Sequence, residues 1–295
     1  MYTQAITPHR SFALKPLAAA VLVVCATGLH AAPSFNGSPG NNVTVETTGS
    51  TTTVTQSATP SNRALANWND FSVPVDEVVV FEQPNANSVI LNRVLGSNPS
   101  EIFGRLSANG RVFLINPNGI VFGANSEVNV GGLVASTLSL KPGMQSNSDE
   151  VGLEINGTAG SIINNGHISA KDILLIAPTI ENNGTLASNV ANSSVQLLAA
   201  SEVTVNTADG NLVFQVMAGH ENALIEQLGT VMAEGGRIVF LASASAGGAP
   251  SVINVSNLNQ ATQISVQGDS VRLSGDINST LSNATVEVIA RNIAQ

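Results

Sequence analysis

The stretch RVFLINPNGIVFGANSEVNVGGLVASTLSL, residues 111–140, decides the fold of this chain. At its centre lies the tetrad NPNG, residues 116–119, between the apolar runs Val112–Ile115 and Ile120–Phe122. Asparagine at the first position of a turn can hydrogen-bond the backbone two residues on, proline presets φ at the second, and glycine suits the fourth. The stretch therefore predicts a type I turn between two short β-strands.

Residues 1–31 have the order of a secretory signal peptide: basic residues, an apolar core, then small residues. Arg10 and Lys15 precede LAAAVLVVCATGL at residues 17–29, and alanines follow. The apolar core is too short to cross a bilayer as a lasting anchor. We expect cleavage after Ala31, to within a residue or two, and hence an exported protein. Lipidation at Cys25 is the alternative, disfavoured by the bulky Val24 before it.

The composition excludes several classes of protein. Cys25 is the only cysteine and lies inside the signal, so disulfides cannot hold the exported chain together. The net charge is −9, and the signal removes basic residues only, which argues against a nucleic-acid partner. Charged residues make up only 11% of the chain. Asn, Ser, Thr and Gly take their place among Val, Ile and Leu, which favours an all-β fold over disorder.

Repeats downstream of residue 145 predict a β-solenoid. INNGHISA at residues 163–170 is echoed 18 residues later by IENNGTLAS at 180–188, and more weakly by LGTVMA at 228–233. Short apolar runs bounded by Asn, Gly, Ser or Pro lie between the echoes. A period near 20 residues indicates coils of about three short strands, in which asparagines at matching positions could stack as ladders. A β-sandwich is the alternative, and the alternating run at residues 44–55 is expected to form an exposed strand or hairpin.

The longer string INPNGIVFG, followed by VNVGGLVAST, resembles the haemagglutination-activity (secretion) domain of two-partner secretion exoproteins, the filamentous-haemagglutinin-like family. Upstream, WNDFSVP at residues 68–74 and the segments after it follow the family order more loosely. Some members have a second Asn-Pro-Asn turn there, but this chain has Asn98-Pro99-Ser100 instead. The resemblance implies a right-handed parallel β-helix with N-terminal capping strands and extra-helical hairpins. We expect a signal peptide (1–31), a secretion domain (32–145) and continuing coils (146–295).

The resemblance also implies partners and a route. The general secretory machinery would carry the chain to the periplasm, and an outer-membrane β-barrel transporter with periplasmic domains would export it. The product would be secreted or held at the surface of a Gram-negative cell, where it could bind a host-cell or bacterial surface ligand. The expected secretion motif is Asn116, Pro117, Asn118 and Gly119, supported by Ile120, Gly123, Asn129, Gly131 and Gly132. Trp68, the only tryptophan, is expected to cap the solenoid, with partner docking as the alternative.

No residue pattern points to catalysis, a metal or a cofactor. Adjacent acids such as Asp76-Glu77 point to opposite faces of a strand, and only His167 and His220 remain after the signal. We therefore expect no enzyme, no metal and no cofactor. The expected function is a filamentous-haemagglutinin-type adhesin or its N-terminal portion. The alternatives are the stem of a contact-dependent toxin or haemolysin and, less favoured, a polysaccharide-active β-helix enzyme.

Overall fold

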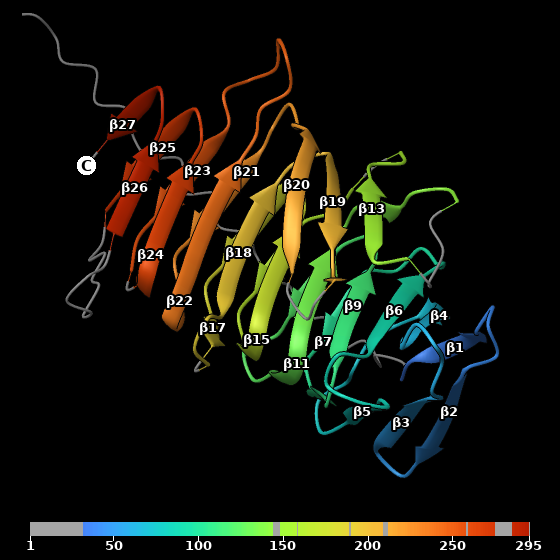
Figure 1. Ribbon diagram of the computed structural model, residues 1–295. Helices are drawn as coiled ribbons and strands as arrows, with labels where there is room; N and C mark the ends of the chain where they lie inside the picture. Colours follow the sequence, from blue (N-terminus) through green and yellow to red (C-terminus); the bar gives the residue numbers. More distant parts are fainter. Residues whose placement is uncertain are drawn as a thin grey trace, which may run out of the picture.

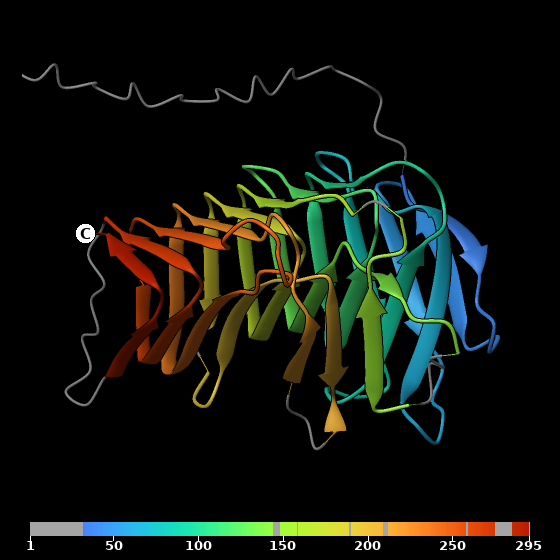
Figure 2. The same ribbon diagram turned by 90° about the horizontal axis from the view of Figure 1, so that it is seen from above.

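Short β-strands follow one another along the chain and wind into coils stacked along one axis (Figure 1). The computed structural model describes residues 32–143, 148–157, 159–188, 190–208, 212–257, 259–274 and 285–294. The expected signal peptide and Cys25 lie outside these residues. Figure 2 shows the stack from above, with the N-terminal coils in blue and the last coils in red.

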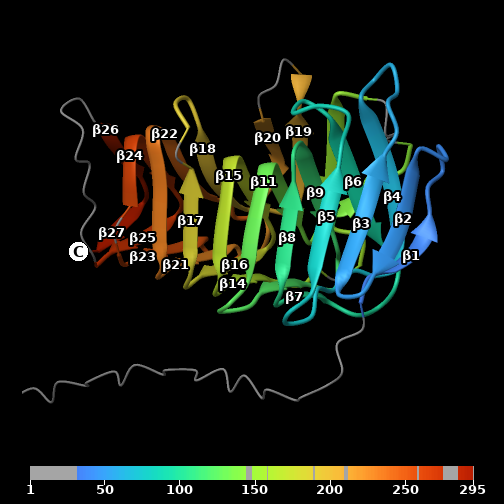
Figure 3. The ribbon, with the colours of Figure 1, turned by 90° about the horizontal axis from the view of Figure 1, so that it is seen from below.

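Most coils contribute a strand to each of three faces, and on every face the strands of successive coils pair in parallel. The first face contains β7 (Ser100–Ile102), β10 (Ile120–Phe122), β14 (Ile162–Asn164), β16 (Thr179–Asn182), β21 (Leu224–Gln227), β23 (Val252–Val255), β25 (Ser270–Leu273) and β27 (Asn292–Ala294). The second, seen in Figure 3, contains β3 (Thr51–Gln56), β5 (Val78–Glu82), β8 (Arg105–Ala108), β17 (Thr185–Ser188) and the first parts of β11 (Glu127–Ser136), β15 (His167–Ile176), β22 (Thr230–Ala242) and β24 (Asn259–Gln267). The third contains β4 (Arg63–Asp70), β6 (Val89–Val94), β9 (Arg111–Ile115), β18 (Ser194–Ala199), β26 (Thr285–Ile289) and the second parts of those four long strands. The chain is a parallel β-helix, as the sequence predicted.

The N-terminal end of the β-helix is covered by two antiparallel strands. β1 (Ser34–Gly37) pairs with β4, and β2 (Val43–Thr48) pairs with β3 as a hairpin. The hairpin confirms the prediction made for residues 44–55. Reversing the strand direction at this end interrupts the parallel stack, so a further coil cannot be added there in the same register.

Buried polar side chains form a ladder at the end of the first face. The Nδ2 of Asn164 donates to Oδ1 of Asn182, and the Nδ2 of Asn182 donates to Oε1 of Gln227, both at 2.7 Å. All three side chains are fully buried. The echoes in the sequence are therefore real structural repeats, since His167 pairs with Thr185, and Thr185 with Thr230. In this ladder each amide satisfies the next, which offsets the cost of burying them.

A separate four-stranded antiparallel sheet covers the outside of the third face (Figure 1). Its order is β12 (Ser139–Leu140), β13 (Glu150–Glu154), β19 (Glu202–Asn206) and β20 (Val213–Ala218). Where this sheet covers it, the third face is apolar on both sides. One hydrophobic cluster fills the inside of the β-helix, and a second lies between the third face and the extra sheet, with Phe113, Leu174 and Val203 among its buried members.

Two arginines from early coils donate hydrogen bonds to residues that flank β13 and β19 in this sheet. Arg63 donates to Asp149 at 3.2 Å, and Arg111 donates to the carbonyl of Thr207 at 3.5 Å. Thr207 in turn donates its hydroxyl to the Asp149 carbonyl at 3.1 Å. Burial lowers the pKa of both arginines, and the bond to Asp149 opposes that shift at Arg63. The first coils and the later hairpins are thus joined across several turns of the β-helix.

Candidate functional site

The NPNG tetrad forms a closed turn at the corner between the third face and the first. The Gly119 N–H donates to the Asn116 carbonyl at 3.2 Å, which closes a β-turn. The Oδ1 of Asn116 accepts from the Asn118 N–H at 3.0 Å, the side-chain-to-backbone bond that the sequence suggested. Gly119 has φ of +124°, a conformation that side chains other than glycine rarely adopt. The sequence therefore predicted this turn and its internal bonding correctly.

The Asn116 side chain also joins the turn to the coil below. Asn116 is fully buried, and its Nδ2 donates to the Asn98 carbonyl and to Ser100 Oγ, each at 3.0 Å. The Asn118 Nδ2 donates to the Gly96 carbonyl at 2.9 Å. The segment Asn98-Pro99-Ser100, which departs from the family pattern, lies directly beneath the tetrad. Its serine provides an acceptor to the asparagine above it.

The next coil closes over the turn from the other side. Gly160 donates its N–H to the Pro117 carbonyl at 2.7 Å, and Ile120 donates to the Ser161 carbonyl at 3.1 Å. A Cβ atom added at Gly160 would lie 2.6 Å from the Asn118 carbonyl oxygen. The turn is thus enclosed between two coils, and only a glycine fits above it.

The supporting residues take different positions around the same coils. Ile120 is buried in the inner core. Gly123 begins the turn between β10 and β11, and a Cβ there would meet the Phe103 ring at 2.1 Å. Asn129 is exposed on β11. Gly131 lies where β11 turns from its pairing with β8 to its pairing with β9, and a Cβ there would lie 2.7 Å from the Gly110 carbonyl oxygen.

Gly132 follows at that corner and is the first residue of β11 to pair with β9. A Cβ at Gly132 would lie 3.1 Å from Cγ of Arg111, a tight contact with a movable side chain. The pair at 131–132 therefore lets one strand bend across two faces while the coils remain in close contact.

Trp68 lies one layer inside the N-terminal cap. Its ring is fully buried and packs edge-on against Phe35 of β1 at 5.2 Å and against Phe71 at 4.9 Å, measured between ring centroids. Its Nε1 donates to Oδ1 of buried Asn92 at 3.0 Å, and the Asn92 Nδ2 donates to the Phe113 carbonyl at 3.1 Å. The end of the core is covered by β1, and Trp68 fills the layer beneath it.

The hydrogen-bond partners of Asn116 and Trp68 could not be predicted from the sequence. Ser100 and Asn92 are fully buried polar residues that accept hydrogen bonds from Asn116 and Trp68 respectively. For Asn92, the signal was a polar residue at an inward position of the otherwise apolar SVILNRVL segment. No pattern marked Ser100, because its role depends on which turn lies above it.

The described part of the chain offers no metal site and no membrane-spanning helix. It contains no group of three or more His, Cys, Asp or Glu side chains placed to hold a metal ion. Its strands are accompanied by no helix long and apolar enough to cross a membrane. His167 is exposed at the start of β15, as its place in the repeat suggested.

Comparison with known proteins decides the family. The family model described as the TPS secretion domain matches residues 31–288. The chain belongs to the TPS secretion domain family. A TPS secretion domain directs a two-partner system, in which an outer-membrane transporter exports the protein that contains the domain. The match extends through the NPNG turn and the later coils alike.

Two curated relatives of this TPS domain come from Haemophilus influenzae, and both are named heme/hemopexin-binding protein. One is 32% identical over 199 residues, which cover 64% of this chain and 21% of the relative. The other is 36% identical over 135 residues, which cover 44% of this chain and 14% of the relative. The chain thus spans about a fifth or less of the length of these relatives.

Two solved structures share the fold of this TPS domain. The HMW1 secretion domain from Haemophilus influenzae superposes with a TM-score of 0.65 at 24% identity, covering 86% of this chain and 73% of that one. The filamentous hemagglutinin secretion domain superposes with a TM-score of 0.53 at 16% identity, covering 90% of this chain and 100% of that one. The family resemblance and the β-helix predicted from the sequence are both confirmed.

Proposed function

We propose that this chain is the export-directing part of a surface-binding exoprotein of the filamentous-haemagglutinin type. The TPS match over residues 31–288 carries the proposal. On this account the general secretory machinery delivers the chain to the periplasm, and a β-barrel transporter with periplasmic domains passes it through the outer membrane. The β-helix then forms outside. Coils that each depend on the one before suit folding that proceeds as the chain emerges.

The NPNG turn is proposed to keep the domain competent for export. The enclosed position of Asn116, bonded to one coil while the next closes over the turn, supports this role. The experiment is export of the full chain by the transporter of its own two-partner system. We expect Asn116→Ala to lower the secreted amount and Asn87→Ala, at an exposed position outside the motif, to leave it unchanged. Equal secretion of the two variants would refute a role for the turn.

Outside the cell we propose binding to a host-cell or bacterial surface rather than catalysis. The support is the family, together with acidic residues that follow no catalytic arrangement in the sequence. A toxin or haemolysin stem and a polysaccharide-active β-helix remain the alternatives. The test is adhesion of beads coated with the purified chain to erythrocytes and epithelial cells. Beads that adhere no better than albumin-coated beads would count against an adhesin.

Binding of heme or hemopexin is the second candidate function. It is favoured by the 32% identity to a heme/hemopexin-binding protein over 199 residues. The shared part is only 21% of that relative, so the similarity supports export more directly than ligand binding. Titration with hemin, followed by its absorbance, and with immobilised hemopexin separates the possibilities. A saturable signal with either ligand supports this candidate, and none with both removes it for this chain.

A further inference from the structure

Among the described strands, β20 is the outermost of the extra-helical sheet and leaves one edge unpaired. β20 pairs with β19 on one side, and no other described strand pairs with it. Its sequence, VFQVMA, contains neither a charged residue nor a proline, the usual protections of an edge strand. Val213 and Met217 are 55% and 52% exposed on its outer side. Pairing with β19 is regular from Val213 to Val216 and becomes irregular only toward Ala218.

The β-helix extends beyond this edge and forms a shelf beside it. β22, β24 and β26 continue past β20 (Figure 1), and no described strand of the extra sheet covers them. Phe214 and Val216 on β20 and Leu241 on β22 are only partly buried against the outer core. The apolar layer beneath the sheet therefore continues onto β22, whereas the outward positions of β24 are the polar residues Gln263, Ser265 and Gln267.

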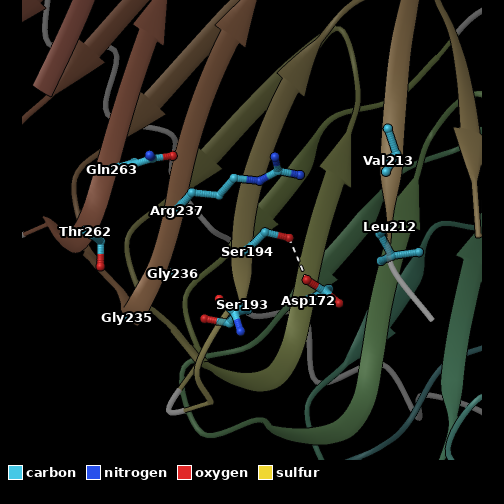
Figure 4. Close-up of a pocket in the computed structure, with 11 residues that line it drawn as sticks. Asp172, Ser193, Ser194, Leu212, Val213, Gly235, Gly236, Arg237, Thr262 and Gln263 are labelled. Atoms are coloured by element: carbon cyan, nitrogen blue, oxygen red, sulfur yellow. Dashed lines mark hydrogen bonds between the residues drawn. The ribbon is translucent and has the colours of Figure 1, made fainter. Parts of the chain in front are cut away.

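A polar pocket lies at one end of the shelf, where β20 begins. It encloses about 480 Å³ between Leu212 and Val213 on one side and Arg237 and Gln263 on the other (Figure 4). Asp172 forms part of its floor, where it accepts from Ser194 Oγ at 2.7 Å. Asp172 is 5% exposed and is balanced electrostatically by Arg111. Arg237, by contrast, is exposed on β22 and provides the positive charge of the pocket.

We propose that the free edge of β20 binds an extended peptide segment of a partner protein, which adds as a fifth antiparallel strand. Hydrogen bonds to the backbone of an edge strand give affinity. One set of alternate side chains of the segment would face the shelf, and the other set would lie on the outer side, beside Val213 and Met217. Every pairing in this sheet is antiparallel, so the segment runs opposite to β20. Its C-terminal end then lies beside Val213, and a carboxylate there meets the guanidinium of Arg237.

The shelf decides between a peptide and a second copy of the chain. If β20 paired with β20 of another molecule, the extra sheet would continue past this edge, over β22 and β24, whose positions Figure 1 shows. The second β-helix would lie beneath its own part of that sheet and would overlap β22 and β24. A single strand is thin enough to lie on the shelf and to extend the outer apolar layer. The occupant is therefore an extended segment with alternating apolar residues and a carboxylate at its C-terminal end.

The test uses a fluorescein-labelled peptide of three Thr-Val repeats with a free C-terminal carboxylate, titrated with the purified full chain. We expect a saturable rise in anisotropy, lost when alternate backbone nitrogens of the peptide are methylated. Amidation of the C-terminus should weaken binding about tenfold, the effect of one charge-assisted hydrogen bond. Arg237→Gln should cause the same loss for the acid peptide and none for the amide. Arg272→Gln, at an exposed arginine on β25, is the matched control.

Three results would overturn the proposal. No saturable signal with the acid peptide, or equally tight binding of the methylated peptide, would exclude strand addition. A loss in Arg272→Gln equal to that in Arg237→Gln would exclude the placed carboxylate. Light scattering on the free chain provides a further check, because a dimer that Met217→Lys on β20 abolishes would assign the edge to a second copy.

Discussion

Replacing Asn116 by alanine should destabilise the folded chain by about 3 kcal/mol. The side chain is fully buried and makes four hydrogen bonds at 3.0 Å, one of them from the side-chain amide of exposed Asn118, which water can satisfy in the variant. The other three are with the Asn118 N–H, the Asn98 carbonyl and Ser100 Oγ. Each is worth about 1 kcal/mol net, and alanine leaves buried partners without them. The loss acts at a corner held between two coils, so neighbouring coils cannot move to restore the bonds.

Urea unfolding followed by tryptophan fluorescence measures this loss. Trp68 is the only tryptophan and is fully buried, so its emission reports on the N-terminal coils. Asn129→Ala is the matched control, because Asn129 is exposed on β11, and it should change stability by less than about 0.5 kcal/mol. An Asn116→Ala midpoint indistinguishable from that of Asn129→Ala would refute the reasoning.

Two further predictions concern the later coils. Gly184→Ala should destabilise the β-helix by about 2 kcal/mol or more, because the new Cβ would lie 2.1 Å from the Gly166 carbonyl oxygen. Thermal unfolding measures this loss, and an unchanged midpoint would contradict the close stacking of the coils. The Ser251 N–H holds the pKa of Asp269 below its usual range, with help from the Ser251 hydroxyl and Arg291. A lowered folded pKa gives stability that is present above the unfolded value, about pH 4, and lost as the pH falls through the folded value. Asp269→Asn should therefore lessen the loss of stability below about pH 4, and identical acid-unfolding curves for variant and wild type would exclude this contribution.

The sequence predicted the β-helix because its local signals agree with the coil geometry. The echoes at residues 163–170 and 180–188 became neighbouring strands with asparagines in register. The NPNG turn was predictable in the same way, since its bonds to Asn118 and Gly119 are made within four residues. Turn chemistry and repeat spacing depend on residues close together in the chain, so they can be recognised in a single sequence.

The extra-helical sheet was predicted only as unspecified hairpins from the family resemblance. β13 pairs with β19, which lies about fifty residues later in the sequence, and the sequence of neither strand indicates that pairing. The continuous burial of third-face strands was a sequence signal for this sheet that was overlooked. β9 is buried at all five positions, whereas the first part of β22 alternates. A strand apolar on both sides indicates a layer on both sides, and β9 therefore implied an outer cover.

The contacts around Asn116 were unpredictable for a related reason. Its donors reach Asn98 and Ser100, 18 and 16 residues earlier, and that alignment depends on the length of the coil between them. Trp68 was expected at the end of the core, but the antiparallel β1 and its Phe35 take the outer position. Strand direction at a cap is set by pairing, which the composition of residues 34–37 does not reveal.

The central claim is that this chain is exported by the outer-membrane transporter of a two-partner system. The most direct measurement is the amount of chain in the culture medium and on the cell surface, with the transporter of its own system present or absent. The account predicts export with the transporter and retention in the periplasm without it. Equal amounts outside the cell in both strains would contradict the account.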